Sequence, residues 1–211
     1  ITLSAVMGMA ALTGCGGKSD SAKKTAKVIE VDLTDEQYAF GVDKDQPDLL
    51  KEVNQFVKDM KSDGTFDEIC NRYFGDGTPV PVKSAAYDES KDQLVVATNA
   101  AFEPFEYMKG EDYCGIDMEI AKALADKLGK ELVIQNMDFD AVCLSVGQHK
   151  CDVAMAGLTI KPDREEYVAF SDPYYSASQK LITLSTDTEF DACKTADDVN
   201  KILEAKGSDL K

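Results

Sequence analysis

Residues 94–137 decide the fold, and they read LVVATNAAFEPFEYMKGEDYCGIDMEIAKALADKLGKELVIQNM. The apolar run at 94–98 is typical of a buried strand. Apolar side chains then recur every fourth position over 116–128, which predicts a helix with one apolar face. A second apolar run at 131–137 predicts another strand, so the stretch forms a strand–helix–strand unit.

The same alternation continues downstream. Residues 139–148 predict a helix, and 153–156 predict a short buried strand that ends at Gly157. Repeated units of this kind form a parallel sheet covered by helices, in which ligands bind outside the carboxyl ends of the strands. Further on, 180–185 predicts a strand, and the residues 195–198 resemble a capping box that opens a helix.

The segment upstream of residue 94 has its own elements. Alternating apolar and polar residues over 28–43 predict two extended strands. A helix with one apolar stripe opens at Asp48, after a proline, and is closed at Gly64. A second, shorter helix over 66–74 ends at Gly75, where we expect the left-handed conformation of a helix cap.

Composition excludes several classes of function. The 211 residues are 44% hydrophobic and 29% charged, which allows one sizeable core or two small lobes. Asp and Glu (39) outnumber Lys and Arg (23), and the net charge of -16 repels phosphate backbones, so we expect no nucleic-acid partner. The single histidine, His149, cannot by itself supply a histidine-based metal centre. No residue spacing implies a cofactor or a metal ion.

The amino-terminal segment indicates export. Residues 1–12 are apolar and uncharged, but a bilayer-spanning helix needs about 20 residues, so they are typical of the hydrophobic part of a secretory signal. Leu12-Thr13-Gly14-Cys15 resembles the lipobox of bacterial lipoproteins, which implies lipidation at Cys15. A polar, flexible tether follows. The alternative is a buried apolar helix with an ordinary core cysteine.

Five cysteines remain once Cys15 is set aside, and an odd number cannot all form disulfides. They are Cys70, Cys114, Cys143, Cys151 and Cys193. Their spacing matches no metal-binding pattern, and Cys70 and Cys143 lie on apolar helical faces, where cysteine acts as a small hydrophobic residue. Cys143 with Cys151 is the one pairing that the predicted elements allow us to consider.

Three segments that follow predicted strands carry candidate binding chemistry: 98–107, 137–140 and 156–164. The last combines a glycine, which permits close backbone approach, with the Thr159 hydroxyl and with Arg164 in the first turn of a helix. A guanidinium in this position can bind a carboxylate through two hydrogen bonds, while aromatic faces hold the aliphatic part of a small zwitterion. The alternative is that Arg164 pairs with Asp163 or Glu165 on a solvated surface.

In these segments the sequence resembles the bacterial extracellular solute-binding proteins that supply polar amino acids to ABC importers. The matching stretches are LVVATNAAFEPFEY (94–107), GIDMEIAKALADKLG (115–129), MDFDAVCLSVGQHKCDVAMAGLTIKPDREEYVAFSDPYY (137–175) and YAFGVDKDQPDLLKEVNQFVKDMKSDGTFDEICNRYFG (38–75). The resemblance implies an α/β fold of the periplasmic binding protein-like II class. The chain would contain lobe 1, with a parallel-type sheet flanked by helices, then hinge strands at 170–175 and 37–42, and only the beginning of lobe 2.

The resemblance also implies a set of ligand-binding residues. The family's aromatic platforms fall on Phe102 and Phe139, and its carboxylate-binding arginine falls on Arg164. Its backbone and hydroxyl contacts fall on Gly157 and Thr159. Asn99 matches a position that contacts the ligand side chain in some members. No catalytic residue and no metal ligand is implied.

Three departures from the family pattern are visible. The segment that resembles the family's carboxy-terminal end (38–75) precedes the segment that resembles its start, so the order is circularly permuted. The second lobe's later motifs do not occur before Lys211, which we interpret as truncation. Lys161 replaces a threonine that is common in the family, which leaves the surroundings of the bound carboxylate open.

These features predict an organisation in six parts: a lipoprotein signal segment (1–15), a flexible tether (16–27), a permuted carboxy-terminal piece with a hinge strand and lobe 1 helices (28–75), a connector (76–92), the main part of lobe 1 (93–178), and a hinge strand with the start of an incomplete lobe 2 (179–211). The implied protein is not an enzyme. It is a lipid-anchored receptor, at the extracellular face of the cytoplasmic membrane or in the periplasm, that binds a free amino acid and delivers it to an ABC transporter permease.

Two alternatives remain open. The first is a periplasmic dehydratase-like enzyme on the same fold, for which Glu103 and Glu106 are the carboxyls in the first loop that could act as a general acid. The second is a ligand-sensing module of a signalling protein. The sequence leaves the identity of the amino acid open among cationic, polar and sulfur-containing ones.

Overall fold

The computed structural model describes residues 25–209, which fall into two compact units. One unit comprises Glu36–Ser176, and the other combines the described residues up to Asp35 with those from Ala177 onward. Cys15 and the predicted lipobox lie outside the described residues. Within the described range, no helix is both long enough and apolar enough to cross a membrane.

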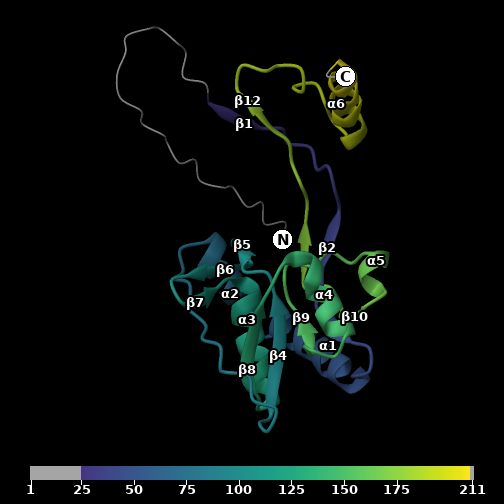
Figure 1. The fold of residues 1–211 in the computed structure, drawn as a ribbon. Helices are drawn as coiled ribbons and strands as arrows, with labels where there is room; N and C mark the ends of the chain where they lie inside the picture. The colour runs from purple at the N-terminus through teal and green to yellow at the C-terminus, as the bar shows by residue number, and fades with distance from the viewer. Residues whose placement is uncertain (1–24, 210–211) are drawn as a thin grey trace. The chain divides into compact units, whose positions relative to one another are not determined.

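A five-stranded sheet forms the centre of the larger unit (Figure 1), with the order β10 (Val168–Phe170), β3 (Gly41–Asp43), β9 (Val153–Ala154), β4 (Gln93–Thr98) and β8 (Glu131–Asn136). β4 is parallel to both β8 and β9, so the predicted parallel arrangement is confirmed for these three strands. β3 is antiparallel to β9 and to β10. The sheet therefore joins the upstream segment 38–75 and the downstream segment 94–175 in one structure.

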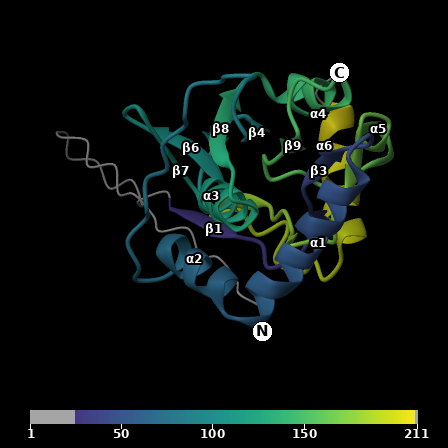
Figure 2. The same cartoon turned by 90° about the horizontal axis from the view of Figure 1, so that it is seen from below.

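Helices cover both faces of this sheet. They are α1 (Pro47–Ser62), α2 (Thr65–Phe74), α3 (Ile116–Leu128), α4 (Phe139–Gly147) and the short α5 (Pro162–Glu165). Val95 and Ala97 of β4 belong to the same buried cluster as Val142 of α4. Alternate residues of a strand point to opposite faces of the sheet. α4 covers the face to which Val95 and Ala97 point, and α3, which also packs on β4, covers the opposite face. α2 packs against both α1 and α3, and Figure 2 shows it following directly on α1 and lying beside α3.

Two small sheets complete the larger unit. β5 (Ala101–Phe102), β6 (Glu106–Lys109) and β7 (Asp112–Cys114) form an antiparallel three-stranded sheet in the loop after β4. β2 (Glu36–Tyr38) pairs with β11 (Tyr175–Ala177). The sequence predicts an extended segment at β2. The spacing of apolar and polar residues does not predict the β5–β7 sheet.

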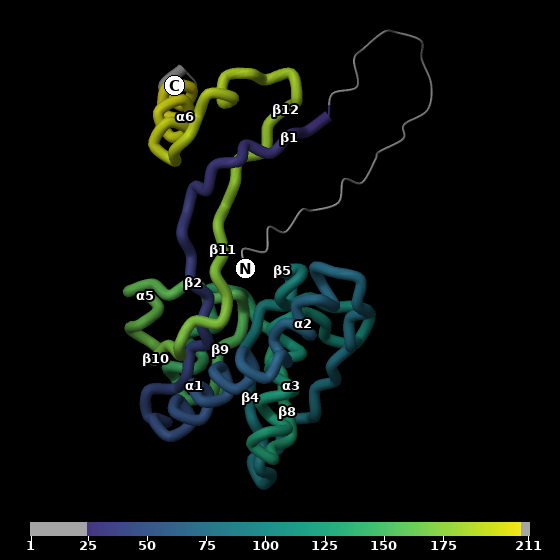
Figure 3. Tube along the Cα trace, turned by 180° about the vertical axis from the view of Figure 1, so that it is seen from behind, coloured from purple at the N-terminus to yellow at the C-terminus, as the bar shows by residue number. Residues whose placement is uncertain are grey.

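The smaller unit contains β1 (Ala26–Val28), β12 (Ile182–Leu184) and α6 (Ala196–Asp209), shown in Figure 3. β1 and β12 are antiparallel. Its core is a cluster of Ile29, Val31, Phe190 and Val199. The predicted capping box is confirmed at the start of α6, where the Asp198 N–H donates to Thr195 Oγ1 (3.3 Å) and the Thr195 N–H donates to Asp198 Oδ2 (3.1 Å).

The structure corrects one helix end. We expected Gly75 to be the left-handed cap of α2, but its φ is -121°. The left-handed residue is Gly64, with φ +90°, at the turn that joins α1 to α2. The Gly75 N–H instead closes α2 by donating to Asn71 O at 3.0 Å. The glycine that the turn requires lies at the start of α2.

The five described cysteines are free thiols, so Cys143 and Cys151 are not paired. Both are buried, as are Cys70 and Cys114. Cys143 and Cys151 belong to the core cluster between α4 and the sheet. The interpretation of Cys70 and Cys143 as buried core residues is confirmed.

Candidate amino-acid site at the strand ends

The carboxyl ends of β8, β4 and β9 are neighbours at one edge of the central sheet, because β4 lies between two parallel partners. The Met137 N–H donates to Thr98 O at 2.9 Å, and the Asn99 Nδ2 group donates to Met137 O at 2.8 Å. The Met155 N–H donates to Ala97 O at 2.9 Å. These bonds hold together the three segments in which the sequence placed its candidate residues.

Arg164 lies in α5 and turns back toward the strand ends. Its Nη1 group donates to Thr159 O at 2.8 Å, and its Cζ lies 5.0 Å from the centroid of the Phe139 ring. Neither contact uses a carboxylate, and no ion pair of Arg164 with an acidic side chain occurs among residues 25–209. The alternative in which Arg164 pairs with Asp163 or Glu165 is therefore wrong.

Gly157 lies three residues after the end of β9 and has φ +52°, a conformation that side chains disfavour. A Cβ atom built at Gly157 would lie 2.9 Å from Cε1 of Phe102. Phe102 also stacks on Phe105, with ring centroids 5.6 Å apart. The Phe102 ring thus lies directly against the glycine backbone, and a side chain at residue 157 would have to displace that ring.

Thr159 links the site to β2. Its Oγ1 hydroxyl donates to Glu36 Oε2 at 3.0 Å, and its backbone forms a bridge with Tyr38. The Ala39 N–H donates to Leu158 O, and the Ile160 N–H donates to Gln37 O, both at 3.0 Å. Residues 157–160 are therefore held along β2, which fixes the positions of Gly157 and Thr159 relative to each other.

We use the name strand-end site for the six residues that the sequence analysis predicts to bind a ligand: Asn99, Phe102, Phe139, Gly157, Thr159 and Arg164. Phe102 lies against Gly157, and Arg164 contacts both the Phe139 ring and the Thr159 carbonyl. Asn99 bonds to the Met137 carbonyl and contacts none of the other five through a hydrogen bond. Phe102 and Phe139 are 44% and 40% exposed, which is unusual for phenylalanine and leaves aromatic surface available to a ligand.

The sequence matches the bacterial extracellular solute-binding proteins, family 3, over residues 10–76 and 94–209. The chain belongs to this family. The unmatched residues 77–93 include most of the predicted connector. The family 3 fold explains the α/β architecture and the position of the strand-end site at the carboxyl ends of parallel strands.

Individual relatives are similar over parts of this family 3 chain. It is 38% identical over 96 residues to the arginine-binding extracellular protein ArtP of Bacillus subtilis (strain 168), covering 46% of this chain and 38% of ArtP. It is 33% identical over 95 residues to cyclohexadienyl dehydratase of Pseudomonas aeruginosa, covering 44% of this chain and 35% of that enzyme. The solved structure of an ancestral arginine-binding protein bound to arginine is 40% identical, covers 40% of this chain and 38% of that one, and has a TM-score of 0.39.

The chain thus matches well under half the length of these relatives. ArtP is named as a binding protein, and cyclohexadienyl dehydratase is named as an enzyme.

Two buried carboxyl groups lie beneath the strand-end site of this solute-binding protein. The sequence analysis did not identify Asp117, and it considered Glu106 only as a general acid for the dehydratase alternative. Asp117, in the first turn of α3, accepts hydrogen bonds from the Gly157 N–H (2.8 Å) and the Tyr174 hydroxyl (2.6 Å). Glu106 of β6 has no exposed surface. A signal was present in the sequence, because Asp117 and Glu119 interrupt an otherwise apolar helix start, but acidic residues are common in the first turn of any helix.

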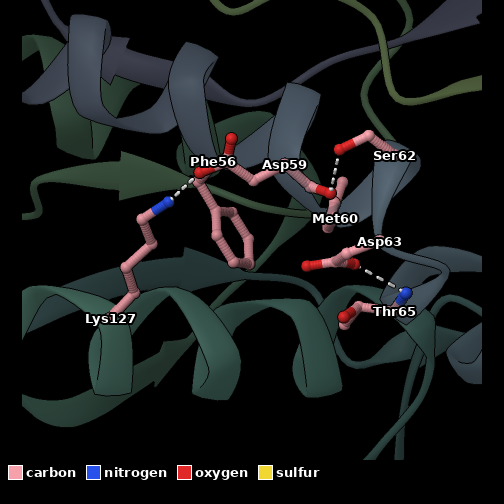
Figure 4. Close-up of a pocket in the computed structure, with 7 residues that line it drawn as sticks. All are labelled: Phe56, Asp59, Met60, Ser62, Asp63, Thr65 and Lys127. Carbon is pink, nitrogen blue, oxygen red and sulfur yellow. Dashed lines mark hydrogen bonds and ion pairs between the residues drawn. The ribbon is translucent and has the colours of Figure 1, made fainter.

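A separate surface hollow of about 330 Å³ is lined by Phe56, Asp59, Met60, Ser62, Asp63, Thr65 and Lys127 (Figure 4). It lies between α1, the start of α2 and the end of α3, and Lys127 forms an ion pair with Asp59 across it. None of the six residues of the strand-end site lines it. Its polar side chains bond to one another or to nearby backbone, and we assign no ligand to it.

Among residues 25–209, the side chains that could together hold a metal ion are Asp43, Asp45 and His149, whose ligand atoms lie within 4.8 Å of one another. Asp43 ends β3, which is antiparallel to β9, so this group lies at the sheet edge opposite the strand-end site. His149 Nδ1 lies 2.7 Å from Asp43 Oδ2. The hydrogen bond to Asp43 raises the pKa of His149.

This pair predicts a pH dependence of stability. The pKa of His149 in the folded state is raised above its usual 6.5. The stabilisation that protonated His149 gives to the folded state is therefore fully present below pH 6.5, and it is lost as the pH rises through the folded pKa. We expect the free energy of unfolding to fall over this window in the wild type, and to fall less in His149→Gln. Urea unfolding between pH 5.5 and 8.5, chosen to span about one unit below and two above the usual pKa, measures the difference. An identical slope in both proteins contradicts the prediction.

Proposed function

We propose that this chain is the ligand-binding part of an extracellular receptor that binds a free cationic amino acid, arginine in the first instance, and delivers it to an ABC importer. The observation that carries the proposal is the position of Arg164. Its guanidinium lies over the exposed Phe139 ring and has no acidic partner in the described part of the chain. A guanidinium in that state is available to a carboxylate ligand.

The roles of the other residues follow from their positions. Arg164 would bind the α-carboxylate, and the carbonyl of Gly157 together with the Thr159 hydroxyl would contact the α-ammonium group. The exposed rings of Phe102 and Phe139 offer flat faces to a guanidinium or ammonium side chain, an attraction of about 0.5–2 kcal/mol. Asn99, held by the Met137 carbonyl, would contact the end of the side chain.

Two observations support a cationic ligand. The relatives named above include an arginine-binding protein at 38% identity. Acidic side chains also lie beside the site in sequence and space, since Glu36 bonds to Thr159 and both Asp138 and Asp140 flank Phe139. Such a surface favours a ligand with net positive charge.

A titration of the 15N-labelled chain with a panel of free amino acids tests this function. We expect saturable binding of L-arginine, weaker binding of lysine and histidine, and little binding of glutamate. The shifted amide signals should belong to residues 99–102, 137–140 and 156–164. If no amino acid in the panel shifts these signals, the proposed function is wrong.

Gly157→Ala should weaken ligand binding more than its backbone strain explains. An added methyl group at Gly157 must displace the Phe102 ring, because the two would be 2.9 Å apart. We expect the arginine Kd to rise about tenfold, since overpacking costs about 1–3 kcal/mol. Calorimetry measures the change.

Gly129→Ala is the matched control. Gly129 also has a positive φ, +70°, but nothing lies within 4 Å of an added Cβ. Both variants therefore lose roughly 1–2 kcal/mol of stability through backbone strain, but we expect Gly129→Ala to leave the arginine Kd unchanged. Equal affinities in the two variants would show that Phe102 does not take part.

We also propose lipid anchoring through Cys15, a secretory signal before it, and a circularly permuted order of segments with the six-part organisation given above. Anchoring would hold the receptor at the extracellular face of the cytoplasmic membrane, or in the periplasm, beside its permease. Metabolic labelling with an alkyne fatty acid in a bacterial host tests it. The label should be incorporated into the wild type and absent from Cys15→Ala; equal labelling would exclude Cys15 as the lipid site.

A dehydratase is the second candidate, because one relative at 33% identity is named cyclohexadienyl dehydratase. That chemistry needs a carboxylic acid that reaches the substrate. Glu103 is exposed, and Glu106 has no exposed surface with which to reach a bound molecule. Incubation of the purified protein with prephenate, followed by product analysis, decides between the two candidates.

A further inference from the structure

Glu106 is a buried carboxyl group without a partner. Its side chain has no solvent exposure, and neither Oε1 nor Oε2 accepts a hydrogen bond from any group in the described part of the chain. It lies on β6 opposite Phe102 of the strand-end site, with which it is paired in register. An ionised carboxylate in this position would lose its hydration without any replacement, which is a large cost, whereas the neutral acid loses far less.

A second buried carboxyl group lies beside it. The Asp117 N–H donates to Phe105 O at 2.9 Å, which holds the first turn of α3 against the residue next to Glu106. Unlike Glu106, the Asp117 carboxylate is fully bonded: Oδ2 accepts the Gly157 N–H and Oδ1 accepts the Tyr174 hydroxyl. Asp117 thereby holds the peptide of Gly157, against which Phe102 lies.

Among residues 25–209, no positively charged side chain acts on either carboxyl group. The titratable groups that interact with one or both carboxyls are Tyr38 of β2, Cys70 of α2 and Tyr174. All three are neutral at physiological pH, and their own pKa values are raised, mainly by burial. Two negative charges here would repel each other with no cation to offset them.

Burial, and then the charge of Asp117, raise the pKa of Glu106 to about 11. Burial raises the pKa of Asp117 to about 6, against the opposing effect of its bonds from Gly157 and Tyr174. At neutral pH the two carboxyls therefore keep one proton, and it resides on Glu106.

We propose that Glu106 is a positioning residue which stays a neutral carboxylic acid, so that the pair's single negative charge remains on Asp117 and fixes the Gly157 peptide beneath the ligand. Its effect on ligand affinity rests on the proposed function; its protonation does not. A neutral Glu106 leaves Asp117 free to remain ionised as the acceptor of two hydrogen bonds. An ionised Glu106 would favour protonation of Asp117 and weaken its hold on Gly157.

The test compares Glu106→Gln, which mimics the neutral acid, with Asp117→Asn and with Glu103→Gln, an exposed glutamate of the same loop. In the wild type the folded state keeps a proton on Glu106 that the unfolded chain releases above pH 4.5. The folding equilibrium constant should therefore fall with rising pH, by up to about tenfold per unit from this group. Glu106→Gln should lack that contribution, whereas Glu103→Gln should keep the wild-type slope.

Arginine affinity at pH 7 gives the second measurement. We expect Glu106→Gln to bind within about threefold of the wild type, and Asp117→Asn to bind at least tenfold more weakly, since a charge-assisted bond is lost. An unchanged stability slope in Glu106→Gln, or an affinity as low as that of Asp117→Asn, overturns the proposal. If the wild type binds no arginine, the proposed function fails, but the slope still decides where the proton resides.

A measurement on the wild type alone covers the case in which variants do not fold. Carbon-13 NMR of protein labelled at the glutamate carboxyls should show one signal at the chemical shift of a protonated acid throughout pH 5–9, the range that lies between the usual glutamate pKa and the raised one. If every glutamate signal is that of an ionised carboxylate at neutral pH, Glu106 is not neutral and the proposal is overturned.

Discussion

Arg164→Ala is expected to weaken arginine binding by about 30-fold to several thousandfold, because truncating one partner of a buried, hydrogen-bonded charge pair costs about 2–5 kcal/mol. In the free protein, Arg164 bonds to a backbone carbonyl and lies on an aromatic ring, so its removal leaves no buried acidic group unpaired. The loss should therefore appear in ligand affinity and hardly in stability. Calorimetry and urea unfolding on the same samples measure both.

Two further variants sharpen this prediction. Arg164→Lys keeps the charge but not the planar fork of donors, so its affinity should be intermediate. Lys51→Ala removes one positive charge from α1, where Lys51 pairs with Asp48 and is largely exposed, and should leave affinity unchanged. If Arg164→Ala binds arginine as well as Lys51→Ala does, Arg164 is not part of the site.

Phe40→Ala is expected to lower the free energy of unfolding by about 3–5 kcal/mol, the usual cost of removing a buried phenylalanine. Phe40 has no solvent exposure and stacks on the buried Tyr174, with ring centroids 4.3 Å apart. The Phe40 N–H also donates to the Ser171 hydroxyl at 3.0 Å. The ring therefore supports the loop that presents the Tyr174 hydroxyl to Asp117. Urea unfolding measures the loss.

Phe139→Ala provides the contrast, because the same substitution is made at a ring that is 40% exposed. We expect it to cost less than about 1 kcal/mol of stability and to lower arginine affinity by about 2-fold to 30-fold through loss of the aromatic face. The two variants thus separate the residues that form the scaffold from those that form the site. A large stability loss in Phe139→Ala with unchanged affinity would place Phe139 in the core instead.

Regular periodicity explains why most elements could be predicted from the sequence. Helix α3 has the predicted bounds, 116–128, because apolar residues at a helical spacing pack on a sheet wherever it lies. The three parallel strands begin or end within two residues of their predicted bounds. Because consecutive parallel strands end at the same edge of a sheet, the approximate position of the strand-end site was predictable too.

Features that depend on contacts distant in the sequence were not predictable in this way. The β5–β7 sheet consists of strands of two to four residues, too short to show alternation. The buried Glu106 and Asp117 have the sequence signature of exposed acidic residues, and only the packing of β6, α3 and residue 174 removes them from water. The hydrogen bond from Arg164 to Thr159 likewise needs α5 to turn back on the loop that precedes it.

The central claim is that Arg164 binds the carboxylate of a free amino acid at the strand ends. The most direct test measures the affinities of L-arginine and agmatine, which is arginine without its carboxylate, for the wild type and for Arg164→Ala. The wild type should bind arginine far more tightly than agmatine, and Arg164→Ala should bind both about equally. If the wild type does not distinguish the two compounds, or if the variant keeps the full preference for arginine, the claim is contradicted.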